Sequence, residues 1–243
     1  MTWLFNEIIY RPIFNLLVGI YNVIPGHDFG IAIIVLTVAM RIVFLPLSIK
    51  ANRAQRLLAR IQPEIKALQE KFKNDKAAQA QAVMALYKER KINPAGGCLP
   101  LLIQLPILLA LYRALANGLN PDSLKILYTF VTNPGTINQV SLGFFSLAGK
   151  SHVLAIISGI LQFIQAKLMA GRTPKPVPGA KSASVLDPAM LNKQMLYFLP
   201  VMIVVIGWNL PAGLVLYWAV TTLVGVFEQL YVNRLVDKEF GKA

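Results

Sequence analysis

The amino-acid sequence predicts an all-α integral membrane protein with five transmembrane helices, a cytoplasmic antiparallel helical hairpin and an external interfacial helix at the N-terminus. The first observation is composition, since 56% of the 243 residues are hydrophobic, only 14% are charged, and the mean hydropathy is +0.56. The second is a series of apolar runs of about 20 residues, the length that crosses a bilayer core. The third is the distribution of basic residues, which gather beside these runs.

Residues 1–27 are predicted to form an external amphipathic segment that lies in the membrane interface. The segment is rich in aromatic residues and carries Glu7 and Arg11 within its apolar run. It has neither a basic start nor a small-residue cleavage site, so a signal peptide is not indicated. Pro12 is expected to interrupt the helix, because proline removes a backbone donor. The alternative is that the segment forms a first spanning helix.

The spans follow from the positions of charges and helix-breaking residues. Arg41 is the only charge in the 21 residues between Asp28 and Lys50. The uncharged run from 194 to 227 would be about 50 Å long as a helix, too long for one crossing, and Asn209-Leu-Pro-Ala-Gly divides it. The predicted spans are 28–49, 97–119, 151–170, 194–208 and 211–228. An external loop is predicted at 120–150 and a cytoplasmic tail at 229–243. The cytoplasmic loop at 171–193 is rich in Pro, Gly and Ser and is expected to be disordered.

The basic residues predict the orientation of these spans. With the N-terminus outside, the cytoplasmic segments are 50–97, 167–193 and 228–243, and they hold 19 of the 24 Lys and Arg residues. Cytoplasmic segments next to spanning helices carry such an excess of positive charge. We therefore expect the N-terminus outside and the C-terminus in the cytoplasm.

The segment 50–96 is predicted to fold as a helical hairpin. Its first helix carries an apolar seam at spacings of 3, 4, 3 and 4, a turn at Asn74-Asp75-Lys76 follows, and the second helix presents apolar residues up to Tyr87. The basic surface is interpreted as a docking arm for a ribosome, a translocon or anionic lipid; the alternative is a connector with a solvated face. The seam is Leu58, Ile61, Ile65, Leu68 and Phe72, and the docking residues are Arg53, Arg56, Arg60, Lys66, Lys71 and Lys73.

Arg41 is the residue that most favours a functional site within the spans. A charge in mid-span costs at least about 2.5 to 3.5 kcal/mol on insertion scales, and Arg41 lies about 13 Å along the helix from Lys50. Other polar side chains share the spans, which favours a water-filled groove over simple interhelical hydrogen bonding, the alternative interpretation. They are Thr37, Ser48, Gln104, Ser158, Gln162, Gln165 and Tyr217.

Several classes of protein are disfavoured by residues that the sequence lacks. Cys98 is the single cysteine, His27 and His152 lie far apart, and no HExxH or paired-carboxylate cluster accompanies them, so neither a metal site nor an intramembrane hydrolase is expected. No nucleotide-binding loop is present, and the net charge of +13 comes without a nucleic-acid recognition motif. A small secondary transporter with a polar intramembrane site is the alternative, although no internal repeat is visible.

Four stretches resemble the YidC/Oxa/Alb family of membrane protein insertases. The stretch N-PAGGCLPLLIQLPILLALYRAL at 93–115 is similar to the family's signature after its cytoplasmic hairpin, and Y-FLPVMIVVIGWNLPAGLVLYW at 197–218 to its last two helices. R-IVFLPLSIK at 41–50 resembles the first core helix, and YRPIFNLL at 10–17 the external interfacial helix. The resemblance covers nearly the whole chain.

The resemblance implies an insertase that works without cofactor or nucleotide hydrolysis in the bacterial cytoplasmic (inner) membrane, and not an enzyme. The implied partners are nascent membrane-protein clients, the ribosome, the Sec translocon and membrane lipids, without nucleic-acid specificity. The family's hydrophilic groove would contain Arg41, with Gln165 and Trp218 lining or flanking it. With the polar residues already found in the spans, the expected client-binding residues are Arg41, Gln104, Gln162, Gln165, Tyr217 and Trp218. The chain is expected to be a short form without the large periplasmic domain, and its short tail makes a strong tail-mediated ribosome contact unexpected.

Overall fold

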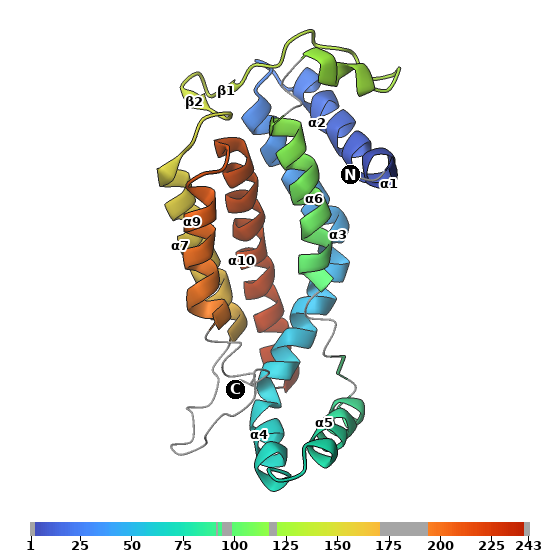
Figure 1. The fold of residues 1–243 in the computed structure, drawn as a ribbon, viewed down its shortest axis with the longest axis vertical. Coiled ribbons are helices and arrows are strands. Elements are labelled where there is room, and N and C mark those ends of the chain that lie inside the picture. Colours follow the sequence, from blue (N-terminus) through green and yellow to red (C-terminus); the bar gives the residue numbers. More distant parts are fainter. Residues whose placement is uncertain (1–2, 91, 94–98, 117–120, 171–193, 241–243) are drawn as a thin grey trace. The chain divides into compact units, whose positions relative to one another are not determined.

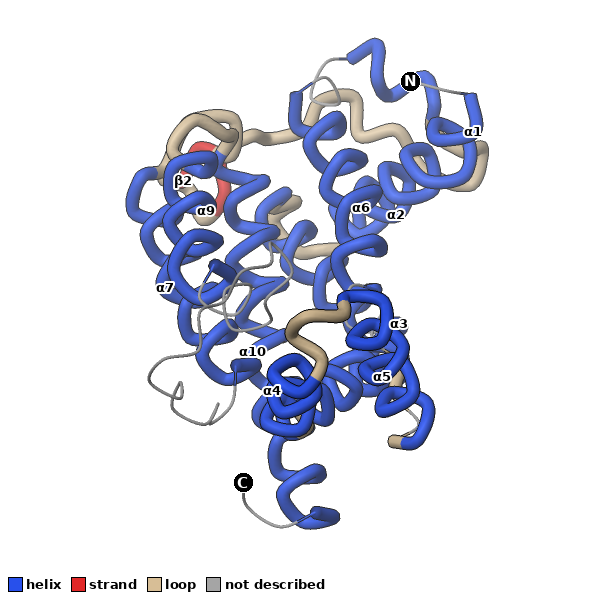
Figure 2. Tube along the Cα trace, turned by 60° about the horizontal axis from the view of Figure 1, so that its bottom comes forward, coloured by secondary structure: helices blue, strands red, loops and turns tan. Residues whose placement is uncertain are grey.

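The computed structural model describes residues 3–90, 92–93, 99–116, 121–170 and 194–240. In Figure 2 these residues form helices joined by loops, with one small strand pair, β1 (Val140–Ser141) and β2 (Phe145–Ser146), which is antiparallel. The loop predicted at 171–193 and Cys98 lie outside the described residues. A mostly helical chain is therefore confirmed for the part that the structure describes.

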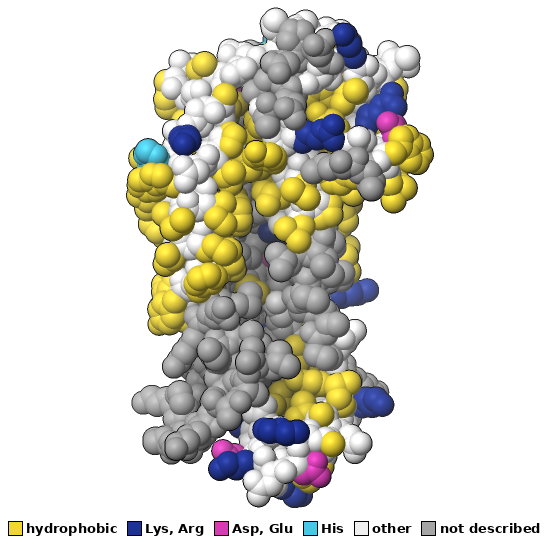
Figure 3. Space-filling model, in the orientation of Figure 1, with side chains coloured by type: hydrophobic (Ala, Val, Ile, Leu, Met, Phe, Trp, Pro, Cys, Tyr) yellow, Lys and Arg dark blue, Asp and Glu magenta, His cyan; other side chains and the backbone are white. Residues whose placement is uncertain are grey.

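Within the described residues, three helices are long and apolar enough to cross a membrane: α3 (Phe29–Arg60), α7 (His152–Ala170) and α10 (Ala212–Phe240). Two shorter apolar helices, α6 (Leu99–Ala116) and α9 (Leu199–Gly207), accompany them, and a π-helix, η4 (Gln194–Phe198), precedes α9. Both α3 and α10 continue as helix beyond the predicted ends of their spans at 49 and 228. Hydrophobic side chains cover the exposed faces of α7 and α9, as a lipid-facing surface requires (Figure 3).

The N-terminal segment is helical from Trp3 to Val23. It consists of α1 (Trp3–Phe5), the π-helix η1 (Asn6–Tyr10) and α2 (Arg11–Val23), seen in dark blue in Figure 1. Pro12 lies in the first turn of α2, where a missing backbone N–H is tolerated. The expected interruption of the helix at Pro12 is therefore wrong, because the chain passes from π-helix to α-helix just before Pro12 and stays helical.

The chain divides into two compact units. Unit 1 comprises Met1–Phe44, Leu101–Gln162 and Pro200–Gly225, and unit 2 comprises Leu45–Pro100, Phe163–Leu199 and Val226–Ala243. In the described part of the chain, five helices contribute residues to both units: α3, α6, α7, α9 and α10.

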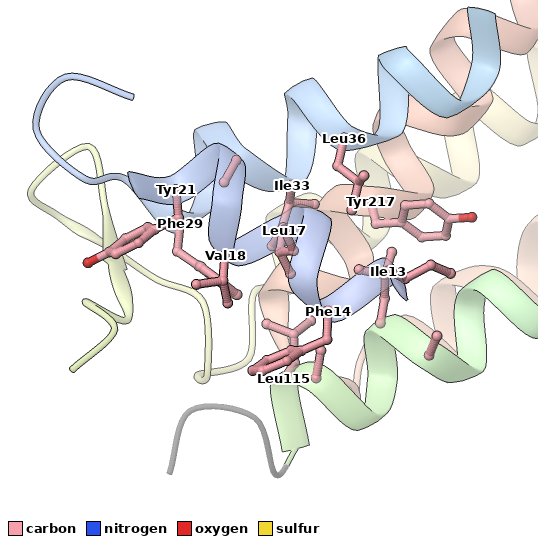
Figure 4. Packing of buried hydrophobic residues seen from close by; sticks show 14 of the residues in the cluster. Ile13, Phe14, Leu17, Val18, Tyr21, Phe29, Ile33, Leu36, Leu115 and Tyr217 are labelled. Carbon is pink, nitrogen blue, oxygen red and sulfur yellow. The ribbon is translucent and has the colours of Figure 1, made fainter. Parts of the chain in front are cut away.

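Unit 1 has a buried apolar cluster to which α2, α3, α6 and α10 contribute. Phe14 and Leu17 of α2 are completely buried and belong to the same cluster as Ile33 of α3, Leu115 of α6 and Tyr217 of α10 (Figure 4). The α2 helix is thus held along its whole inner face by side-chain packing.

The segment between α6 and α7 also belongs to unit 1 and contains a 3₁₀ helix, η3 (Pro121–Ile126), followed by β1 and β2. Asn15 of α2 is buried and fixes the start of this segment. Its Nδ2 donates to the Ile126 carbonyl at 3.3 Å, and its Oδ1 accepts from the Tyr128 N–H at 2.6 Å. The segment is therefore attached to α2 by a side chain that sequence analysis did not single out.

Asp28 joins this segment to the start of α3. Its Oδ1 accepts from the Ile31 N–H at 3.0 Å, as a helix cap does, and from Ser141 Oγ at 2.6 Å, while its Oδ2 accepts from the Leu142 N–H at 2.6 Å. Burial alone would raise the pKa of Asp28, but these hydrogen bonds hold the pKa below its ordinary value. Gly30 allows β1 to lie this close to the start of α3, because a Cβ at position 30 would collide with the Ser141 side chain.

Unit 2 contains two short helices, α4 (Gln62–Lys71) and α5 (Lys76–Glu89), joined by a turn. A small cluster of Ile61, Ile65, Leu86 and Ile92 holds them together. Asp75 caps α5, since its Oδ1 accepts from the Ala78 N–H at 2.9 Å.

Polar contacts in unit 2 link the end of α3 to the end of α10. Arg53 pairs with Glu239 at 2.6 Å and Arg56 with Asp237 at 3.3 Å, and Ser48 donates a hydrogen bond to Glu228. Because Arg56 is buried, its pair with Asp237 is part of the packing between these two helices.

Candidate functional site

Arg41 lies on α3 and donates two hydrogen bonds to Thr221 of α10. Its Nε donates to Thr221 Oγ1 at 3.0 Å, and its Nη2 donates to the Thr221 carbonyl oxygen at 2.6 Å. Two acceptors on one residue fix both the position and the plane of the guanidinium, which cannot lose its proton. The structure thus supplies the backbone carbonyl that a cation within an apolar span needs.

Tyr217 and Gln104 form a second polar contact beside the first. Gln104 Nε2 on α6 donates to Tyr217 Oη at 2.7 Å, and Tyr217 is buried on α10 one helical turn before Thr221. The Thr221 hydroxyl also interacts with the Tyr217 side chain. Arg41, Thr221, Tyr217 and Gln104 therefore form one network across α3, α10 and α6, all within unit 1.

The network offers a fixed positive charge together with hydroxyl and amide groups. Such groups can stabilise a carboxylate or an unpaired peptide group that enters an apolar region, where bare hydrocarbon leaves each polar group without a partner. Among the described residues no cluster of His, Cys, Asp or Glu could hold a metal ion. The groups that the network presents can bind a partner through charge and hydrogen bonds.

The other expected groove residues do not join this network among the described residues. Gln162 on α7 and Trp218 on α10 are half-buried in unit 1, and Gln165 is half-buried on α7 in unit 2. Two further polar residues of the spans are satisfied within helices, because Thr37 donates to the Ile33 carbonyl at 2.6 Å and Ser158 to the Leu154 carbonyl at 2.9 Å.

The expected docking residues fall into two groups. Arg53, Arg56 and Arg60 lie on the last turns of α3, and the first two pair with the end of α10. Lys66 and Lys71 lie on α4, and Lys73 lies in the turn that follows; Lys71 and Lys73 are exposed. Among the expected docking residues on the hairpin, the exposed ones are thus Lys71 and Lys73.

Sequence analysis missed Thr221, which binds Arg41, and Glu228, which accepts from Ser48. Thr221 lies four residues after Tyr217, so helical periodicity from a residue already selected could have found it. Glu228 lies seven residues after Thr221 on the same helix, and the same periodicity applies to it. No signal in the sequence indicates which residue of α10 faces Arg41.

Comparisons with known proteins identify relatives over nearly the whole chain. Residues 19–239 match the family model described as 60Kd inner membrane protein. A "Membrane protein insertase YidC" from Fusobacterium nucleatum is 34% identical over 207 residues, which cover 85% of this chain and 87% of that protein. One from Geobacter metallireducens is 34% identical over 228 residues, covering 93% of this chain but only 37% of its own length.

A solved structure shows the same fold. The chain matches "Active YidC insertase crystal structure with the first transmembrane domain resolved" with a TM-score of 0.55 and 23% identity. The match covers 93% of this chain and 46% of the solved one. The chain therefore spans most of the Fusobacterium relative, but less than half of the solved protein and little more than a third of the Geobacter relative.

Proposed function

Because the chain belongs to the 60Kd inner membrane protein family, the YidC/Oxa insertases, we propose that it carries client transmembrane segments and short external segments into the bilayer through a hydrophilic groove. It is a multi-pass inner-membrane protein of a family that is not enzymatic, so the process needs no bond-breaking step. Hydrophobic transfer of the client span from water to lipid supplies the driving force, at about 25 cal/mol per Å² of apolar surface.

The observation that carries the proposal is the polar network around Arg41. Three helices contribute side chains to it, and Thr221 orients the guanidinium through two hydrogen bonds. A fixed cation in an apolar region attracts acidic residues of a client's external segment and lowers the cost of their entry. Gln162 of α7 and Trp218 of α10, both in unit 1, would extend the wall of the groove.

Local thinning of the bilayer around the short helices would also help insertion. The α9 helix has nine residues and its preceding π-helix five, which is short for a bilayer core about 30 Å thick. Short helices favour local thinning of the bilayer, and thinning shortens the path of a polar segment. With α6 and α9 counted as spans beside α3, α7 and α10, the proposed topology has five spans, with the N-terminus outside and the C-terminus in the cytoplasm.

In this topology the hairpin of α4 and α5 lies in the cytoplasm, where it serves as a docking arm. Lys66, Lys71 and Lys73 supply its positive surface, and the ribosome or the Sec translocon is the proposed partner that delivers clients. Arg53 and Arg56 contribute instead to holding α3 and α10 together, since both pair with acidic residues of α10.

The charge of Arg41 is tested by replacing it with Ala and with Lys in proteoliposomes. Clients with and without acidic residues in their external segment are compared. We expect Arg41→Ala to reduce insertion of the acidic clients several-fold and to affect the others less. Arg41→Lys should restore part of the activity, because an ammonium keeps the charge but not the planar two-acceptor geometry.

Arg113→Ala is the matched control for this experiment. Arg113 also lies in an apolar helix, but it donates to Asn6 Oδ1 and stacks over the Tyr10 ring at 4.8 Å, apart from the network. Arg113→Ala should leave the preference for acidic clients unchanged. Equal insertion of both client types by Arg41→Ala and by the parent would refute the role of the charge.

A further inference from the structure

The turn between β1 and β2 presents two large apolar side chains where a polar turn would be ordinary. Leu142 is 64% exposed and Phe144 80% exposed, with Gly143 between them. Asn and Gly dominate such turns when they face water. The pair therefore forms an exposed apolar tip on a segment outside the apolar helices.

The backbone of this tip is held in an unfavourable conformation. Leu142 has φ of +55°, in the left-handed region that a bulky side chain rarely adopts, and Gly143 follows with φ of +80°. The Asp28 carboxylate accepts the Leu142 N–H at 2.6 Å and so stabilises this conformation. Strain that is held by a specific contact suggests that the exposed leucine has a function.

The tip is also fixed at the ends of the apolar helices. Asp28 immediately precedes α3, so its bond to Leu142 places the tip beside the first turn of that helix. On the other side, the Leu147 and Gly149 carbonyls accept from the N–H groups of Gly213 and Ala212, at the start of α10, at 2.9 and 2.7 Å. Figure 1 shows β1 and β2 beside the start of α10.

We propose that the β1–β2 tip, Leu142 and Phe144, inserts into the lipid interface of the membrane and anchors unit 1 there. The starts of α3 and α10 mark the level at which apolar spans begin, which is where the hydrocarbon core meets the headgroups. Leucine and phenylalanine favour this boundary. Trp208, which is 42% exposed and stacks on His152 at the end of α9, is a residue of the type enriched in the same layer.

The test uses an environment-sensitive fluorophore attached to single cysteines. Cys98 is replaced by Ser, and Cys is introduced at Leu142, at Phe144 or, as the control, at Gln139, which is exposed in the same segment near the base of β1. The labelled proteins are reconstituted without partners into vesicles of phosphatidylethanolamine and phosphatidylglycerol. Quenching by spin-labelled lipid and by aqueous iodide is then compared.

We expect the probes at 142 and 144 to be quenched several-fold more by the lipid quencher than the probe at 139, with the reverse order for iodide. Iodide quenching at 142 and 144 as strong as at 139 would place the tip in water and overturn the proposal. Protection from both quenchers would also overturn it, because it would indicate that protein covers the tip.

Leu142→Gly removes the apolar side chain but keeps the backbone conformation, so it tests the two separately. Glycine adopts the positive φ freely, so this variant should keep or raise the melting temperature. Lipid quenching of the probe at 144 should nevertheless fall several-fold in the same variant. Unchanged quenching would show that Leu142 has no part in the anchoring.

Discussion

Unit 1 and the α4–α5 hairpin of unit 2 are stabilised in different ways. Unit 1 buries Phe14, Leu17 and Phe29 completely in a cluster drawn from four helices. The hairpin depends on a cluster of four buried residues, one of which is Ile65, with exposed charged residues on its surface. A large shared core resists local opening, whereas a small one permits it. We therefore expect the α4–α5 hairpin to open locally more readily than unit 1.

The largest expected effect is the loss of stability when a buried residue of each apolar cluster is truncated, and it should differ between the two clusters. Phe14→Ala should cost about 3 to 5 kcal/mol and lower the melting temperature of the whole protein, because its cluster spans four helices. Ile65→Ala should cost about 2 kcal/mol, the low end for such changes, and loosen only the hairpin. Thermal unfolding in detergent measures the first effect, and limited proteolysis within 62–89 measures the second.

Leu16→Ala is the control, since Leu16 is the exposed neighbour of Leu17 on the same helix. It should change neither measurement. A fall in melting temperature for Ile65→Ala as large as that for Phe14→Ala would show that the hairpin unfolds together with unit 1.

Gly30→Ala should produce the next largest effect. The new Cβ would lie 2.7 Å from Ser141 Cβ, so β1 must move away from the start of α3. Overpacking of this kind costs about 1 to 3 kcal/mol. Ser141→Gly in the same protein should recover part of the melting temperature, because it removes the colliding atoms. The absence of any recovery would mean that the clash is not the cause.

The aspartate that caps α3, Asp28, should make the stability of the fold depend on pH. The pKa of Asp28 is lower in the folded protein, so its charge stabilises the fold above the unfolded pKa of about 3.9 and this contribution is lost as pH falls through the folded pKa. In Asp28→Asn an amide NH₂ replaces one of the accepting oxygens and meets a backbone N–H, so one hydrogen bond is lost. The free energy of unfolding should fall by about 1 kcal/mol at pH 7, allowing for partial exposure. The difference in melting temperature between parent and variant should shrink below about pH 4.

Asp75→Asn provides the comparison in unit 2. Asp75 is exposed, its Oδ1 accepts from a single backbone N–H, that of Ala78, and asparagine caps helices equally well. We expect Asp75→Asn to lower the melting temperature less than Asp28→Asn does at pH 7. Equal losses in the two variants would show that the extra bonds of Asp28 to Ser141 and Leu142 carry no stability.

The sequence predicted the elements whose signal is local. Apolar length found the three clear spans, and the charge at Arg41 identified the centre of the polar network. The Asn74-Asp75-Lys76 turn lies where α5 begins, because an aspartate cap is a signal contained in a few residues.

Contacts between distant residues could not be predicted in the same way. Thr221 meets Arg41 from 180 positions away, and the asparagine of α2 that holds η3 is separated from it by more than 100 residues. Helices α3 and α10 also continue beyond the predicted span ends at 49 and 228, while the spans themselves stay a prediction. Ion pairs of Arg53 and Arg56 with α10 accompany the continued helix, and hydropathy does not register such pairs.

The smallest expected effect concerns the Arg90–Glu64 pair on the hairpin. Its atoms lie 2.8 Å apart, and the bond to Glu64 raises the pKa of Arg90, yet both side chains are nearly half exposed. Exposed pairs add little to stability because water and salt screen them. Glu64→Gln should therefore leave proteolysis within 62–89 unchanged at both low and high salt. A clear increase in cleavage, seen only at low salt, would show that this pair holds α4 to α5, and the small apolar cluster would then no longer account for the hairpin by itself.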